Sequence, residues 1–235
     1  MGRYRQQVFE AARTLVAEKG LLEFSMRDLA KASQISVGTL YREISNKDDL
    51  VLLMAADNVR RHGVGLDSAL EFGLNPAEQM MFLIGFAPYC IDFANLDASQ
   101  DPNVGTDFLV GNCDLVAQAT AEAIEEFQAS FRHYRQQVDE LVSRLSDGSA
   151  FSDSKERAKE VAMDLSILCR GTRVMRIMRT NLKFRANQIE TEKLCQLAEL
   201  ILGQLHWRQM RPLLDPKKLE LAWRTAMDQQ GMVPR

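Results

Sequence analysis

The stretch FSMRDLAKASQISVGTLYREISNKDDL, residues 24–50, carries two helix-start signals that stand eleven residues apart. Ser25 is followed three residues later by Asp28, so each side chain can accept a backbone N–H group of the other residue. Ser36 can begin a second helix in a similar way. Each serine is preceded by an apolar residue that can pack on another apolar residue inside the helix. Only about three residues, 33–35, remain to turn the chain. The stretch therefore predicts a helix-turn-helix.

The strings LAKA (29–32), ISVGTLY (35–41) and NKDDL (46–50) resemble the N-terminal DNA-binding domain of the TetR family of transcriptional regulators. The resemblance covers roughly residues 4–60. It implies a recognition helix that enters the major groove of double-stranded DNA with its N-terminus first. It also implies a homodimer that binds a palindromic operator.

The resemblance assigns roles to single residues of the recognition helix. Tyr41 and Lys47 are expected to hold phosphates, with Thr39 as a further backbone contact. Val37 can contact a thymine methyl group, and Gly38 lets the backbone approach the bases. Arg27 matches a family position that sometimes reads guanine, although a phosphate or solvent role is equally open. The predicted DNA-binding residues are Arg27, Ser36, Val37, Gly38, Thr39, Tyr41 and Lys47.

Three residues depart from the family pattern. Gln34 stands at the turn position where the family usually has glycine, and a positive φ there costs on the order of 1 kcal/mol. Glu43 replaces a residue that often touches phosphate, and its carboxylate repels the DNA backbone. Ile44 replaces an aromatic residue but can still fill the core between the helices.

Composition bounds the remaining possibilities. The 235 residues, 46% of them hydrophobic, suffice for one or two domains with sizeable cores. No basic and apolar leader and no run of about 18 apolar residues occurs, so we expect a soluble cytoplasmic protein without a membrane span. The cysteines (90, 113, 169 and 195) and the three histidines are scattered. We therefore expect no disulfide framework, metal site or cofactor, and favour buried thiols over a redox sensor.

Glycine and proline stand almost wholly between segments of helical periodicity, so we expect an all-α protein. The N-terminal domain is expected at residues 1–62 and an effector-binding and dimerisation domain at 63–235. Helices are expected at residues 4–19, from Ser25, from Ser36, from about Asn46, from Asn75-Pro76, for about thirty residues from Asp114, at 155–183 and 190–210, and after Pro216.

Charge is distributed unevenly along the chain. Residues 1–61 contain 10 Lys and Arg against 8 Asp and Glu, whereas the remainder contains 19 against 24. The net charge of -3 therefore does not argue against DNA binding. Residues 62–131 contain eleven acids and no Lys or Arg.

A Met- and Phe-rich segment, residues 80–93, can be either ordinary core or part of an effector pocket. The resemblance favours a pocket for a mainly apolar compound, because family members enclose a small effector in this half and methionine suits adaptable apolar pockets. The acids of residues 62–131 favour a neutral or cationic ligand over a fatty acid, which would need an arginine. The predicted pocket residues are Met80, Phe86, Tyr89, Phe93, Phe127, Phe131 and, for an anion, Arg173.

These patterns together indicate a homodimeric transcriptional regulator, and we favour a repressor that a small hydrophobic effector releases from its operator. Residues 155–183 and 190–210 carry more apolar surface than one inward stripe needs, which favours a self-complementary interface. The alternative is a helical ligand- or partner-binding protein that has lost sequence-specific DNA binding, as Glu43 and Gln34 could allow. An enzyme ranks third, because no nucleophile-base pair or metal cluster is evident and no catalytic residue can be named.

Overall fold

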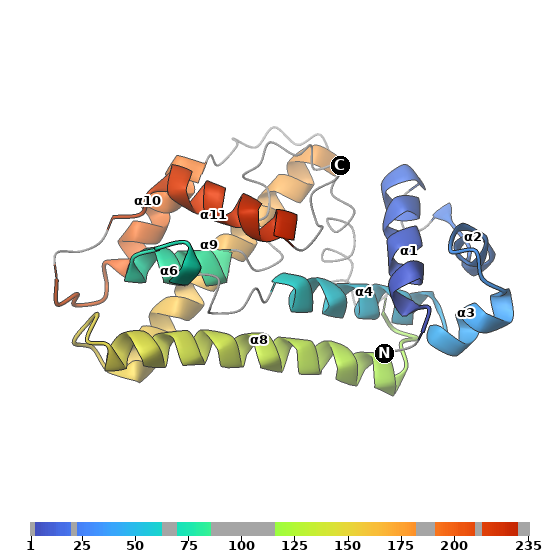
Figure 1. Cartoon of the computed structure of the whole chain (residues 1–235), viewed down its shortest axis with the longest axis horizontal. Coiled ribbons are helices and arrows are strands. Elements are labelled where there is room, and N and C mark those ends of the chain that lie inside the picture. The colour runs from blue at the N-terminus through green and yellow to red at the C-terminus, as the bar shows by residue number, and fades with distance from the viewer. Residues whose placement is uncertain are drawn as a thin grey trace. The chain divides into compact units, whose positions relative to one another are not determined.

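The computed structural model describes residues 3–19, 23–62, 70–85, 116–181, 191–209 and 213–229. Regular secondary structure in these ranges is α-helical, apart from an isolated antiparallel bridge between Phe151 and Trp207 (Figure 1). The expected all-α class is confirmed. The described helices are α1 (Arg5–Lys19), α2 (Met26–Ala32), α3 (Val37–Glu43), α4 (Lys47–His62), α6 (Pro76–Gly85), α8 (Ala121–Asp147), α9 (Lys155–Asn181), α10 (Thr191–Leu202) and α11 (Pro216–Gln229).

The chain folds into two compact units. The first unit consists of Met1–Val59 and Asp97–Phe131, and the second of Arg60–Leu96 and Arg132–Arg235. The described part of the segment 97–131 therefore packs with the N-terminal helices. The expected division into two domains, with a boundary between residues 62 and 63, stays a prediction. No helix in the described ranges is both long and apolar enough to cross a lipid bilayer.

The two short helices of the first unit begin at the serines that the sequence indicated. Ser25 Oγ accepts the N–H of Asp28 at 3.2 Å, and the Asp28 carboxylate accepts the N–H of Ser25 at 2.8 Å. Ser36 Oγ accepts the N–H of Thr39 at 3.0 Å. Both predicted caps are confirmed, and they fix the first residues of α2 and α3.

The turn between α2 and α3 places Gln34 at a φ of 54°. The N–H of Ile35 bonds the carbonyl of Ala30 and the N–H of Gln34 bonds that of Lys31, both at 3.1 Å. This pair of hydrogen bonds is the Schellman motif, which requires positive φ at the position of Gln34. From α1, Gln7 donates to the carbonyl of Ser33 at 2.6 Å. The expected helix-turn-helix is therefore present, with a strained residue in its turn.

α8 begins later than the sequence predicted. The helix runs from Ala121 for 27 residues, and residues 116–120 before it are not helical. Asp49 at the start of α4 accepts the N–H of Thr120 at 2.7 Å, and Asp48 accepts the N–H of Gln118 at 2.8 Å. Thr120 Oγ1 then accepts the N–H of Ala123 at 3.3 Å, as a helix cap does. A continuous helix from Asp114 was the wrong prediction, because contacts with α4 hold residues 116–120 in an irregular conformation.

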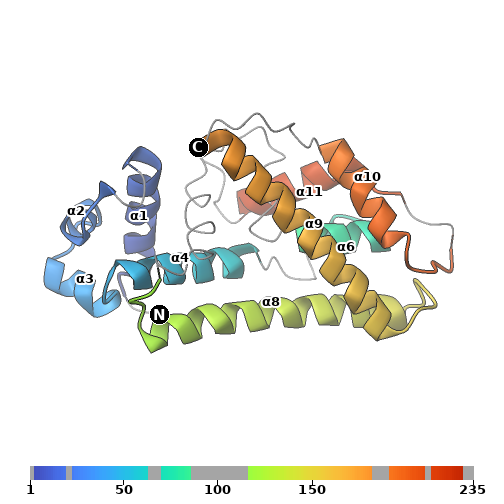
Figure 2. The same ribbon diagram turned by 180° about the vertical axis from the view of Figure 1, so that it is seen from behind.

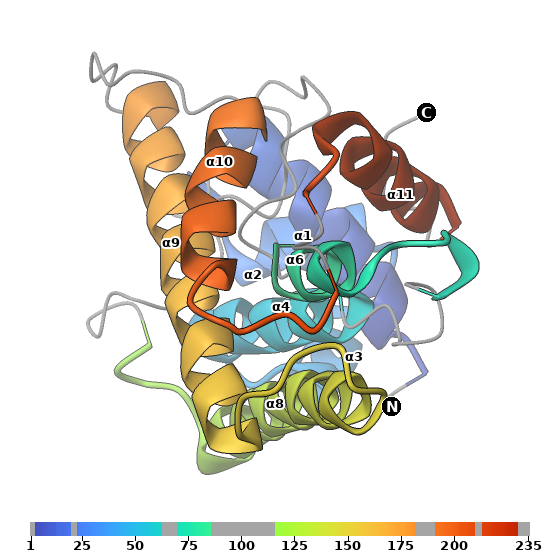
Figure 3. The same ribbon diagram turned by 90° about the vertical axis from the view of Figure 1, so that its left-hand side faces the viewer.

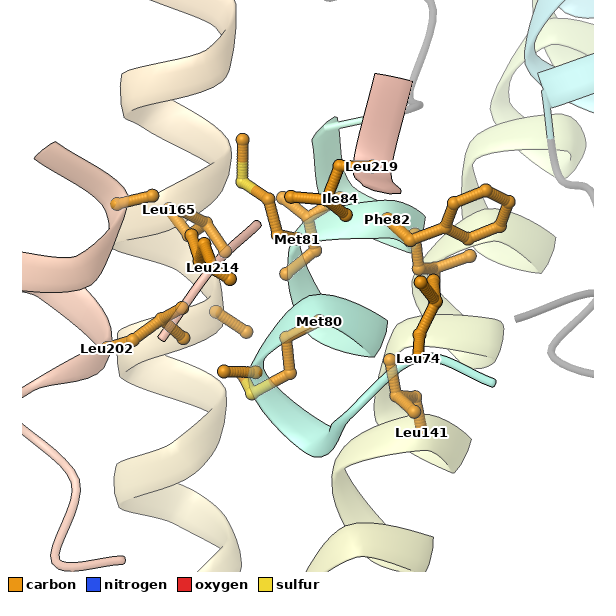
Figure 4. Packing of buried hydrophobic residues seen from close by; sticks show 14 of the residues in the cluster. Leu74, Met80, Met81, Phe82, Ile84, Leu141, Leu165, Leu202, Leu214 and Leu219 are labelled. Atoms are coloured by element: carbon orange, nitrogen blue, oxygen red, sulfur yellow. The ribbon is translucent and has the colours of Figure 1, made fainter. Parts of the chain in front are cut away.

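In the second unit, α6 is buried on all sides, as its sequence predicted. Figure 4 shows Met80, Met81 and Phe82 among leucines from the surrounding elements. α6 packs against α9 and α11. The indole N–H of Trp223, on α11, donates to the Phe82 carbonyl at 3.1 Å. This bond satisfies one of the carbonyls that the C-terminal end of α6 leaves without a helical partner.

α9 and α10 pack side by side, as Figures 2 and 3 show. α10 ends at Leu202, so the expectation of one helix over residues 190–210 was wrong. The Trp207 indole donates to the Leu202 carbonyl at 2.9 Å, and Trp207 pairs with Phe151 in the isolated bridge. Trp207 is partly buried against Phe151, with ring centroids 5.8 Å apart, and their backbone bridge takes the place of the helix expected beyond Leu202.

Candidate DNA-binding site

α3 turns one stripe of side chains to the core of the first unit and the rest to solvent. Leu40 and the C-cap residue Ile44 are buried. Val37 is 40% exposed and Tyr41 is 49% exposed, although both are large apolar side chains. The two lie one helical turn apart, on the same side of α3. Adjacent exposed apolar groups of this kind favour an interaction surface.

A chain of hydrogen bonds connects the N-cap of α3 with two polar residues of the helix. Ser36 Oγ and Thr39 Oγ1 lie 2.8 Å apart, and Nη2 of Arg42 donates to Thr39 Oγ1 at 3.1 Å. The cap of α3 is therefore linked, through Thr39, to a cationic side chain nearly two turns later. This arrangement holds two hydroxyls and a guanidinium together on the surface, groups that donate hydrogen bonds to phosphates and base edges.

Gly38 lies on the exposed side of α3. A Cβ atom at this position would meet no neighbouring atom closer than Ser36 Oγ, at 4.0 Å. The fold therefore does not require glycine here. The missing side chain leaves the backbone of α3 accessible from outside.

Lys47, an expected phosphate contact, is engaged within the first unit. Its ammonium group donates to the carbonyl of Phe24 and lies 4.5 Å from the centroid of the Phe24 ring. Desolvation lowers the pKa of Lys47, while the charges of Glu23 and Asp28 oppose this shift. One of the three ammonium donors is used by the carbonyl, and the others remain for a phosphate.

The acids that flank the helix-turn-helix are largely occupied by hydrogen bonds. Asp28 bonds both the N–H and the hydroxyl of Ser25, and these bonds lower the pKa of its carboxyl. Asp48 and Asp49 accept hydrogen bonds from Gln118 and Thr120. Glu43 remains half-buried at the end of α3. Bound carboxylates still carry charge, but their positions are fixed.

Arg27, the remaining predicted contact, is exposed in the second position of α2. The predicted set Ser36, Val37, Gly38, Thr39 and Tyr41 lies together at the start and along the open side of α3. Sequence reasoning missed Arg42 and the contacts of Asp48 and Asp49. The helical position of Arg42, opposite Leu40 and Ile44, was a usable signal. Nothing local in the sequence indicates the contact between Asp49 and Thr120, which are 71 residues apart.

The predicted effector residues are only partly described. Met80 is fully buried in the core of the second unit. Phe127 packs on the core of the first unit, with its ring centroid 4.9 Å from that of Phe131. Phe86, Tyr89 and Phe93 lie outside the described residues, as does the side chain of Arg173. The effector pocket therefore stays a prediction.

Comparison with known proteins bears on the N-terminal part of the chain. Residues 8–54 match the family of bacterial regulatory proteins, tetR family. An HTH-type transcriptional regulator from Haemophilus influenzae is 41% identical over 46 residues, which are 20% of this chain and 25% of that protein. The chain therefore aligns with about a quarter of the length of this curated relative. Its N-terminal helix-turn-helix is therefore similar to that of the tetR family of bacterial regulatory proteins.

Solved structures extend the likeness of fold to nearly the whole chain. The fatty acid degradation regulator FadR from Bacillus halodurans has a TM-score of 0.54 and 20% identity, over 88% of this chain and 99% of that one. A protein from Saccharomonospora viridis in complex with choline has a TM-score of 0.59 and 16% identity, over 87% and 98% of the two chains. Identity at this level shows the fold alone. The fold is that of regulators with an N-terminal helix-turn-helix and a helical C-terminal part.

Proposed function

We propose that this regulator binds a palindromic operator in double-stranded DNA and represses transcription until a small apolar effector releases it. The observation that supports DNA binding is the open side of α3. There, exposed Val37 and Tyr41 flank an unobstructed Gly38, and the Ser36 cap is hydrogen-bonded to Thr39. These features match a recognition helix that contacts the major groove with its first turns.

The proposed palindromic operator has two equivalent half-sites, so we propose that two copies of the chain bind it as a homodimer. Two recognition helices must stand about 34 Å apart to occupy successive turns of the major groove. On α9, Met163 is 50% and Ile167 is 61% exposed, and on the neighbouring α10 Leu200 is 70% exposed. Met163 and Ile167 are four residues apart and share one face of α9. We propose that this apolar surface meets its copy in a second chain.

Release by an effector is proposed as a population shift. An effector that binds the C-terminal part more tightly in one conformation favours a spacing of the recognition helices that no longer fits the operator. The charge of residues 62–131, all acidic, favours a neutral or cationic apolar compound. A thermal-shift panel of acyl chains, aromatic amines, choline and neutral aromatics tests this. Asp92 is one of the acids of residues 62–131. Stabilisation by long-chain anions alone, abolished by Arg173→Ala but not by Asp92→Asn, would show that the effector is an anion.

The alternative function keeps the fold without specific DNA binding. Two observations favour it: Glu43 places an acid at the end of α3, and Lys47 already bonds Phe24. Selection of bound fragments from genomic DNA by the purified protein distinguishes the two functions. A recovered palindrome supports the regulator, which would then act in the cytoplasm, where the chromosome lies. Fragments without a common sequence support the alternative.

A further inference from the structure

Arg42 lies at the centre of the exposed side of α3. At about 100° per residue, Arg42 points about 160° away from the buried Leu40, and the C-cap residue Ile44 is buried as well. Gly38 is four residues earlier and therefore lies next to Arg42 on the same side. A helix that enters the groove with its open side inward thus brings Arg42 towards the base edges.

The guanidinium of Arg42 is oriented before any DNA arrives. Its Nη2 donates to Thr39 Oγ1 at 3.1 Å, and Thr39 Oγ1 lies 2.8 Å from Ser36 Oγ. This tether uses one of the five N–H donors of the guanidinium and leaves the others. Because a long side chain loses rotamer freedom when it binds, an orienting hydrogen bond reduces that loss.

Other charges leave Arg42 available. In the described part of the chain, Arg5 forms an ion pair with Glu126 and Arg13 forms one with Asp57, whereas Arg42 forms no ion pair. The open surface at Gly38 leaves space beside the Arg42 side chain. An exposed and oriented guanidinium next to a glycine on a recognition helix is suited to a flat base edge.

We propose that Arg42 determines sequence specificity by donating two hydrogen bonds to N7 and O6 of a guanine in the major groove of each half-site. This inference rests on the proposed function, since it names the base that the same surface reads. Arginine binds guanine in this bidentate way more often than any other specific contact. Arg42 would then supply a directional contact that Val37 and Gly38, which lack hydrogen-bonding side chains, cannot supply.

The test compares the wild-type chain with Arg42→Ala and Arg42→Lys. Each protein selects sequences from a random library, and affinities for the wild-type palindrome are measured by fluorescence anisotropy at constant salt. We expect a guanine at one fixed position of each wild-type half-site. Arg42→Ala should lose the preference at that position alone and bind the palindrome about 10- to 100-fold more weakly. Arg42→Lys keeps the charge but lacks the planar fork, so it should also relax this preference.

Replacing that guanine by 7-deazaguanine removes only the N7 acceptor. It should weaken binding by the wild-type protein and leave Arg42→Ala unaffected. Arg208→Ala, which removes an exposed arginine from the second unit, is the matched charge control and should retain the full preference. Uniform weakening by Arg42→Ala on all sequences, with Arg42→Lys unchanged, would show a phosphate contact and overturn the inference. If the wild-type protein itself selects no sequence, the proposed function fails instead.

Discussion

The ammonium group of Lys47 lies 4.5 Å from the ring centroid of Phe24 and donates a hydrogen bond to the Phe24 carbonyl. Phe24 precedes the cap of α2 and Lys47 begins α4, so this contact joins the starts of two helices that flank α3. Lys47 therefore has a structural contact in addition to the proposed phosphate contact. The two roles predict different measurable effects.

Lys47→Ala should weaken binding to every DNA sequence by a similar factor, because a phosphate contact carries no sequence information. The slope of log affinity against log salt should become shallower by about one per half-site. Lys47→Arg, which keeps the charge, should restore the slope. A lower melting temperature of Lys47→Ala with an unchanged salt slope would limit Lys47 to its contact with Phe24.

Gly38→Ala should separate folding from DNA binding. The new Cβ would meet nothing closer than Ser36 Oγ at 4.0 Å, and alanine is favoured over glycine in a helix by roughly 0.5–1 kcal/mol. The melting temperature should therefore stay equal or rise. Affinity for the selected palindrome should fall by about tenfold or more, or about 1.4 kcal/mol, if the backbone approaches DNA at Gly38. Unchanged affinity would show that the DNA does not approach the backbone of α3 at Gly38.

The double variant Ile167→Glu, Leu200→Glu should dissociate the proposed homodimer, because charges in an apolar interface lose solvation. Light scattering of the wild-type chain at micromolar concentration should give about twice its mass of 26.6 kDa, and the variant should give the mass of one chain. Leu221→Glu is the matched control, since Leu221 is similarly exposed but lies on α11. A monomeric wild-type protein would contradict both the assembly and the two-half-site mechanism.

Acid should weaken the contact between the loops that follow α8 and α10. Asp153 accepts the backbone N–H of His206 at 2.6 Å, and its other oxygen lies 2.9 Å from His206 Nδ1. Desolvation raises the pKa of the Asp153 carboxyl, but the hydrogen bonds from His206 outweigh it, so the net pKa lies below 3.8. A lowered folded pKa contributes stability above the unfolded value, and this stability is lost as the pH falls through the folded pKa.

Melting temperatures measured from about pH 6 to about pH 2 should test this. Wild type should be more stable than Asp153→Asn at the upper end, and the difference should shrink below the unfolded pKa of 3.8. Asp164→Asn, at an exposed position of α9, serves as the control and should show a smaller dependence. A constant difference over the whole range would exclude titration of Asp153 as its source.

Local sequence patterns predicted the parts of the fold that depend on local interactions. Ser25 and Ser36 begin helices because their side chains bond backbone groups three residues away, and the positive φ of Gln34 follows from the short turn. Two helix ends were wrong because distant residues determine them. Asp49 holds Thr120 before α8, and Trp207 packs on Phe151 after α10.

The same distinction applies to the candidate site. The family strings indicated Val37, Gly38 and Tyr41, which the structure leaves on the open side of α3. They could not indicate that Lys47 bonds Phe24, because that contact depends on how α4 packs beside the start of α2. The hydrogen bond between Arg42 and Thr39 spans only three residues, yet it depends on side-chain conformations that the sequence pattern does not specify.

Fluorescence anisotropy with a selected palindrome and a random duplex, at about 150 mM salt, tests the central claim most directly, because non-specific binding is weak under this condition. If α3 is a recognition helix in a dimer, the palindrome should bind at least about 1,000-fold more tightly than the random duplex. Equal binding of the two duplexes would contradict a sequence-specific regulator and support the helical protein without specific DNA binding.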